Sequence, residues 1–171
     1  MTVAVCLLVF IFWDEVHKFS RYGYVGIFVA SFLAGVTVVI PVPSVFLVFT
    51  MGAALNPILV GLIAGAGEAV GSMGVYLTGL SNSKALHALD KNVVDKFQAW
   101  IHSRGAISVF AMSAIFNPLF FPFTAIAGMM HFGWLKFFVL CLAGKAFKNI
   151  IVAGAGFYGL NALLNLFGFG G

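Results

Sequence analysis

Two apolar segments of this chain are each long enough to cross a membrane, and they constrain its fold more than any other feature. They read ILVGLIAGAGEAVGSMGVYLTG at 58–79 and WLKFFVLCLAGKAFKNIIVAGAGFYG at 134–159. A helix needs about 20 mostly apolar residues to span the hydrocarbon core of a bilayer. The whole chain is 62% hydrophobic and 8% charged, which is more apolar than a water-soluble domain of 171 residues requires. The sequence therefore predicts an all-α, multi-pass integral membrane protein.

The chain divides into two similar halves. Each half has a proline-broken apolar stretch, followed by a long apolar helix with one central glycine–charge pair, Gly67-Glu68 or Gly144-Lys145. The similarity recurs at an offset of about 76 residues, and internal repeats of this kind are typical of transporters. We therefore expect one membrane domain over 1–171, with an N-terminal interfacial helix at 1–22, a first repeat at 23–80, an amphipathic linker at 81–105, a second repeat at 106–159 and a C-terminal tail at 160–171.

Prolines interrupt the first apolar stretch of each half. They are Pro41 and Pro43 in IPVPS (40–44), and Pro118 and Pro122 in NPLFFP (117–122). Proline removes a backbone donor and disfavours the helical conformation of the residue before it. Unwound backbone at membrane depth survives only inside protein or beside a water-filled cavity. We interpret the two stretches as tips of re-entrant hairpins, and the alternative is two kinked helices that cross completely.

This topology inverts the second half relative to the first. A re-entrant hairpin plus one spanning helix gives an odd number of crossings per half, so the two tips enter from opposite faces and meet near the midplane. The expected fold is an inverted repeat of a re-entrant helical hairpin plus a transmembrane helix.

The polar segment between the halves predicts an amphipathic helix. An apolar stripe with a polar opposite face results from residues that recur every three or four positions: Leu86, Leu89, Val93, Phe97 and Trp100 or Ile101. Such a helix lies flat on a membrane or packs on other parts of the protein. The net charge of +4 fits basic residues at an anionic membrane surface and is too small and scattered to indicate nucleic acid as a partner.

Charged residues inside the apolar helices indicate the functional site. Glu68 and Lys145 both fall near the expected bilayer centre, where a charge costs at least about 2.5–3.5 kcal/mol. Neither should face lipid, and matching positions in inverted repeats would let them converge on one cavity. Lys148 lies on the same helix face as Lys145, and Asn117 belongs to the second tip. The cavity made by these residues would handle protons or anions; the alternative is a purely structural Glu68–Lys145 ion pair.

Small residues are expected to let the helices approach closely. They are Gly61, Gly65, Gly67 and Gly71 on the first long helix, and Gly128 and Gly144 in the second half. The four histidines and two cysteines have no metal-ligand spacing, and no nucleophile–base arrangement is visible. The sequence therefore predicts no metal, no cofactor and no enzymatic activity.

Four motifs together resemble the DedA family, also called the VTT-domain or SNARE-associated superfamily. They are Pro41-Val42-Pro43, Gly67-Glu68 with Tyr76 and Gly79, Asn117-Pro118-Leu119-Phe120 with Ala127-Gly128, and Gly144-Lys145-Ala146-Phe147-Lys148. The last two look most like the vacuole-membrane-protein branch. The chain departs from the family at the tips, with Val45 in place of an acidic residue, Ala114 and Phe120 in place of arginines, and Phe121 in place of an aspartate.

The resemblance implies lipid transport, by a flippase for polyprenyl-phosphate carriers or a scramblase for phospholipids. An anionic head group would cross between the tips, with Lys145 or Lys148 countering its charge and Glu68 modulating the cavity. Two alternatives stay open, an ion- or proton-coupled exporter of small solutes and a structural or assembly protein. A homodimer and proton coupling also stay open, and the compact length favours a prokaryotic cell membrane as the location.

Overall fold

The computed structural model describes residues 20–36, 42–81, 91–115 and 119–166, and within these ranges the regular structure is entirely helical. The helices are α3 (Ser20–Val36), α4 (Val42–Ala54), α5 (Pro57–Ser81), α6 (Lys91–Arg104), α7 (Ala106–Ala114), α8 (Phe120–Met129) and α9 (Trp134–Leu166). The predicted all-α class is confirmed for this part of the chain. Two helical segments are long and apolar enough to cross a membrane, Pro57–Ser81 and Trp134–Gly159.

Short polar and glycine-containing turns determine where several helices begin. The Asn56 side-chain oxygen accepts hydrogen bonds from the backbone N–H groups of Ile58 (3.0 Å) and Leu59 (3.3 Å), which caps α5. Pro57 follows as the first helical residue, where its missing N–H group costs nothing. Gly105 (φ 44°) separates α6 from α7, and Gly133 (φ 95°) precedes α9, in a conformation that side chains rarely adopt.

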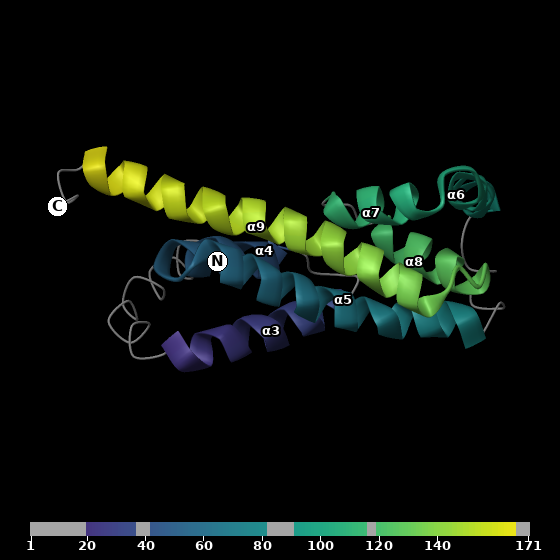
Figure 1. Cartoon of the computed structure of the whole chain (residues 1–171), viewed down its shortest axis with the longest axis horizontal. Helices are drawn as coiled ribbons and strands as arrows, with labels where there is room; N and C mark the ends of the chain where they lie inside the picture. The colour runs from purple at the N-terminus through teal and green to yellow at the C-terminus, as the bar shows by residue number, and fades with distance from the viewer. Residues whose placement is uncertain (1–19, 37–41, 82–90, 116–118, 167–171) are drawn as a thin grey trace.

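The two long helices α5 and α9 pack against each other as an antiparallel pair along the long axis of the molecule (Figure 1). Gly61 lies against the backbone of Ile150, and Gly65 lies against that of Ala146. Residues later in α5 contact residues earlier in α9, so the chain runs in opposite directions through the two helices.

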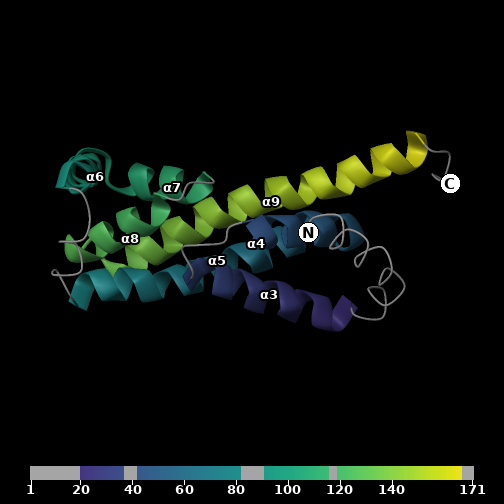
Figure 2. The same ribbon diagram turned by 180° about the vertical axis from the view of Figure 1, so that it is seen from behind.

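The four shorter apolar helices lie along opposite halves of this pair. Figures 1 and 2 show α3 and α4 beside one half, and α7 and α8 beside the other, with α6 next to α7 and α8. In each group, one short helix packs mainly on α5 and the other mainly on α9. Helices α3 and α8 pack on α5, and helices α4 and α7 pack on α9. Each group therefore covers part of the pair rather than its full length.

The predicted tips lie partly outside the described residues. Pro41, Asn117 and Pro118 fall in the ranges that are not described. Pro43 and Pro122 lie in the first turns of α4 and α8, so both helices begin earlier than the expected unwound stretches allow. A proline is tolerated there because N–H groups of the first turn have no partner within the helix.

Two other boundaries differ from expectation. The predicted C-terminal tail begins at residue 160, whereas α9 continues to Leu166. The described part of the linker, α6, turns its apolar stripe towards the protein: Ile101 is buried, and Phe97 and Trp100 contact the ring of Phe123 in α8 at centroid distances of 5.5 and 6.1 Å. The stripe therefore serves packing within the chain, which is the second of the two uses expected for it.

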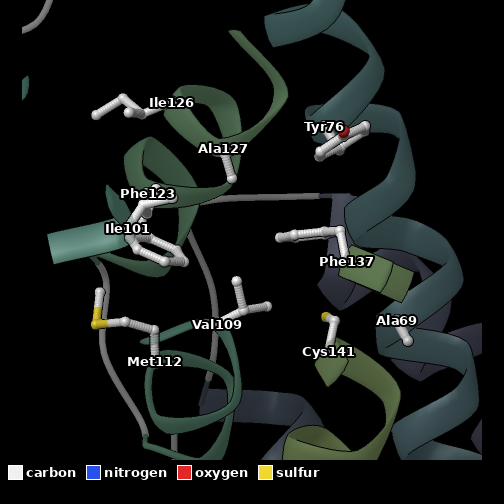
Figure 3. Packing of buried hydrophobic residues seen from close by; sticks show 10 residues of the cluster. All are labelled: Ala69, Tyr76, Ile101, Val109, Met112, Phe123, Ile126, Ala127, Phe137 and Cys141. Atoms are coloured by element: carbon white, nitrogen blue, oxygen red, sulfur yellow. The ribbon is translucent and has the colours of Figure 1, made fainter. Parts of the chain in front are cut away.

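The described residues form two hydrophobic cores. The larger, which we call the aromatic core, draws on five helices; Figure 3 shows its buried members, Ala69, Tyr76, Ile101, Val109, Met112, Phe123, Ile126, Ala127, Phe137 and Cys141. The smaller, the aliphatic core, contains Ile27, Val48, Val60, Ala64 and Ala153. The aromatic core lies on the side of α7 and α8, and the aliphatic core on the side of α3 and α4.

Candidate functional site

The three charged residues singled out in the sequence meet between α5 and α9. The Lys148 Nζ atom lies 2.8 Å from Oε2 of Glu68, and the Lys145 Nζ atom lies 3.3 Å from the same oxygen. Glu68 and Lys145 are each only 6% exposed. The two lysines are three residues apart and share one face of α9, so the antiparallel pairing presents both to one carboxylate.

Asn149 is a fourth member of this cluster that sequence reasoning missed. Its Nδ2 atom donates a hydrogen bond to Oε1 of Glu68 at 3.1 Å, and the residue is 1% exposed. Its Oδ1 atom is buried without a partner among the described residues. The available signal was position, since Asn149 lies four residues after Lys145 and therefore on the same helix face.

The inner ends of both groups of short helices lie at the cluster. Phe120, the first residue of α8, has its ring centroid 4.6 Å from the Lys145 Nζ atom, which is a cation–π contact. Gly35, near the end of α3, lies directly against the backbone of Glu68. Segments that are far apart in the sequence thus enclose one buried group of charges.

The cluster formed by Glu68, Lys145, Lys148 and Asn149 carries a formal surplus of one positive charge, because two ammonium groups face one carboxylate. A buried charge is costly unless it is paired, so a surplus cation makes the site suited to an anionic group. Within the described residues, no group of three His, Cys, Asp or Glu side chains could hold a metal ion.

The predicted packing glycines lie at helix contacts, but not all at the same one. Gly61 and Gly65 contact α9, whereas Gly67 and Gly71 contact the backbone of α3. In the second half, Gly128 lies against Tyr76 of α5, and Gly144 lies against Phe110 and Ser113 of α7. The four glycines predicted to pack on the first long helix therefore serve two different neighbours of α5.

Three further glycines mark close crossings of the helices. A Cβ atom on Gly79 would meet the carbonyl oxygen of Ala125, and a Cβ on Gly156 would meet that of Phe49. Gly52 similarly lies against the backbone of Ala153. Helices α5 and α8, and α9 and α4, approach so closely at these points that no side chain fits between them.

The contacts of the two halves correspond residue by residue. In the crossing of α5 with α8, Gly79 meets Ala125 and Gly128 meets Tyr76. In the crossing of α9 with α4, Gly156 meets Phe49 and Gly52 meets Ala153. The offsets between equivalent residues are 77 (156 − 79 and 153 − 76) and 76 (125 − 49 and 128 − 52). Glu68 and Lys145 are also 77 apart (145 − 68), so the ion pair joins equivalent positions of the two halves.

These features define a helical membrane protein with a buried charged cluster between two groups of short helices. A family model, the VTT domain, matches residues 42–158, and the chain belongs to this family, which includes the DedA and SNARE-associated proteins. The family resemblance seen in the motifs is thereby confirmed, while the vacuole-membrane-protein branch stays a prediction. No curated protein and no solved structure matches the chain.

Proposed function

We propose that this VTT-domain membrane protein moves lipids between the two leaflets, as a scramblase of phospholipids or a flippase of polyprenyl phosphates. The observation that carries the proposal is the net positive, buried cluster at the inner ends of both groups of short helices. An anionic head group would pass this cluster while its acyl or polyprenyl tails stay in the lipid.

Helix lengths support a re-entrant architecture. At a rise of 1.5 Å per residue, α7 (9 residues) and α8 (10 residues) are about 14 and 15 Å long, against a hydrocarbon thickness of about 30 Å. Helix α4 (13 residues) is about 20 Å long, whereas α5 (25 residues) is about 37 Å and is long enough to cross. We infer that α3–α4 and α7–α8 are hairpins that enter from opposite faces and return.

The correspondence between the halves supports an inverted repeat. An operation that exchanges the antiparallel helices α5 and α9 is a twofold rotation about an axis perpendicular to them. If these helices cross the bilayer, that axis lies in the membrane plane, as in transporters with inverted repeats. Glu68 and Lys145 occupy equivalent positions and contact each other, so they lie at the axis and hence near the midplane. A site there can be reached from either face by related movements.

The start of α8 adds a second favourable feature for an anion. Its first residue, Phe120, contacts Lys145, so the positive end of the helix dipole lies beside the cluster. Together with the surplus ammonium group, this end would stabilise a phosphate during its passage.

Reconstitution into lipid vesicles tests the proposal. The purified protein would be inserted into phosphatidylcholine vesicles that carry either a labelled anionic phospholipid or a labelled polyprenyl phosphate, and label loss from each leaflet would be followed. We expect the protein to accelerate exchange and Lys145→Met to slow it by about 10–100-fold, because a hydrogen bond to a charged group is worth about 1.5–3 kcal/mol. Lys136→Met, which removes an exposed lysine of the same helix, is the matched control and should leave the rate unchanged.

The same assay separates the alternatives. Exchange without any gradient indicates a scramblase, and exchange only with a pH gradient indicates a proton-driven flippase. An exporter of small solutes would show gradient-dependent solute flux without lipid exchange. A static structural pair predicts that Glu68→Lys combined with Lys145→Glu preserves stability and every activity. Wild-type vesicles that exchange neither lipid would contradict the proposed function.

A further inference from the structure

The two lysines of the cluster have different surroundings. Lys148 makes the shorter contact with Glu68, at 2.8 Å, and Asn149 fixes the other carboxylate oxygen at 3.1 Å. Lys145 makes a longer contact with Glu68, at 3.3 Å, and its Nζ atom also lies 4.6 Å from the centroid of the Phe120 ring. The carboxylate is therefore held mainly by Lys148 and Asn149, and Lys145 is the more loosely paired cation.

Hydrogen-bond capacity leads to the same distinction. An ammonium group has three N–H donors. Among the described residues, Lys145 has one carboxylate acceptor, at 3.3 Å, and one aromatic face. A ring face is a weaker partner for a buried cation than an anionic oxygen. Within the described part of the chain, Lys145 thus retains both the donors and the unneutralised charge that an incoming anion would use.

The two lysines also differ in their positions relative to the repeat. Lys145 is equivalent to Glu68 at the 77-residue offset, so it lies where the halves meet. The same offset relates Lys148 to Gly71 (148 − 77), which packs against the backbone of α3 and carries no side chain. The position equivalent to Lys148 is therefore uncharged, and Lys148 lies to one side of the meeting point, whereas Lys145 lies where a ligand from either face would arrive.

We propose that Lys145 is the cation that binds the transported anion, and that Lys148 and Asn149 are positioning residues that neutralise and orient Glu68. The assignment rests on the proposed function, since it divides the work of that site between its residues. Without an anion, Lys145 rests on the Phe120 ring; when an anion binds, its oxygens replace that contact. The bound anion would then neutralise the one surplus positive charge of the cluster.

Thermal unfolding in detergent tests the division of roles. Each variant would be melted in potassium phosphate and in potassium chloride of equal ionic strength. For the wild type, we expect phosphate to raise the unfolding temperature by about 2–4 °C. Lys145→Met should abolish this shift and lower the unfolding temperature in chloride by less than Lys148→Met does, because the 2.8 Å ion pair between Lys148 and Glu68 remains. Lys145→Arg should retain the shift.

Variants of the positioning residues Lys148 and Asn149 should lose stability but keep the phosphate shift. Lys148→Met should lower the unfolding temperature in chloride by roughly 5–10 °C, because it leaves Glu68 with its longer, weaker ion pair. It should keep the phosphate shift, and Lys148→Arg should restore the temperature. Asn149→Ala should lower the temperature by less and also keep the shift. A merely structural cluster would show the same phosphate shift in every variant, including Lys145→Met.

Three results would overturn the assignment: no phosphate shift in the wild type, a shift that persists in Lys145→Met but disappears in Lys148→Met, or equal destabilisation by both. Vesicle assays with labelled phosphatidic acid and phosphatidylcholine then separate this inference from the proposed function. If the phosphate shifts follow expectation but the wild type moves no lipid, lipid transport fails and the anion site stands. If lipid moves and Lys145→Met keeps the wild-type preference for phosphatidic acid, the assignment fails and lipid transport stands.

Discussion

The two halves of the molecule share their backbone contacts but differ in the side chains that fill them. On the side of α7 and α8, Tyr76 stacks on Phe137 at 4.8 Å, and Phe123 packs edge-on against two aromatic rings of α6. On the side of α3 and α4, the buried apolar residues are aliphatic and smaller, such as Val48 and Val60. One arrangement of helices is thus built twice, with an aromatic interior on one side and an aliphatic one on the other.

The polar cluster is distributed unevenly between these two sides. Cys141, one turn before Lys145 on α9, belongs to the aromatic core, whereas Lys148 and Asn149 continue along α9 towards α3 and α4. Ser31 of α3 is fully buried, and its hydroxyl oxygen has no partner among the described residues. Unpaired buried polar atoms are the places where water or a polar ligand is stabilised. We therefore expect hydration of the site to begin on the side of α3 and α4.

The largest expected effect compares the two cores directly. Phe123→Ala should reduce the free energy of unfolding by about 3–5 kcal/mol, because it removes a fully buried ring that contacts both Phe97 and Trp100. Val48→Ala, at a fully buried site in the aliphatic core, should cost about 1–3 kcal/mol, since fewer contacts are lost. Reversible unfolding in mixed micelles with increasing sodium dodecyl sulfate measures both. Equal losses would show that the two cores contribute alike and would remove the distinction between them.

A smaller effect tests what the halves share. Gly79→Ala and Gly156→Ala each place a Cβ atom on a backbone carbonyl oxygen, of Ala125 and Phe49 respectively, so we expect each to destabilise by about 1–3 kcal/mol. The two losses should agree within about 0.5 kcal/mol if the crossings are equivalent. The same unfolding assay applies.

Gly74 and Gly154 provide the control, because a Cβ atom at either position meets nothing within 4 Å. Alanine there should be neutral or stabilising by up to about 1 kcal/mol, through its higher helix propensity. A large loss at Gly79 with none at Gly156 would contradict the equivalence of the crossings.

The repeat explains how much of the site could be predicted from the sequence. Two long apolar segments with one central glycine–charge pair gave α5 and α9. The inverted topology expected from the sequence then put Glu68 and Lys145 at the same depth, which led to the prediction that they meet. No such rule identifies Asn149 or Phe120, because their contacts depend on how far a side chain reaches and on where α8 begins.

The glycine and amphipathic patterns predicted which residues would be buried, but not which helix each of them would contact. Regular spacing on α5 predicts close packing, but it does not say that Gly65 contacts α9 while Gly67 contacts α3. The stripe of α6 predicts a buried face without naming what buries it, and α8 does so. Periodicity fixes which residues share a face, whereas the identity of the neighbour depends on the packing of the whole chain.

The smallest expected effect concerns a position where the two halves differ beside the cluster. Phe120 corresponds, at the 76-residue offset, to Ser44, so the ring beside Lys145 has a hydroxyl group as its counterpart (120 − 76). Phe120→Leu should destabilise by about 0.5–2 kcal/mol through loss of the cation–π contact. A double-mutant cycle with Lys145→Met isolates that contact, since the loss caused by Phe120→Leu should be smaller when the ammonium group is absent. A loss of the same size in the Lys145→Met background would assign it to apolar packing, and Lys145 would then have no aromatic partner for an anion to replace.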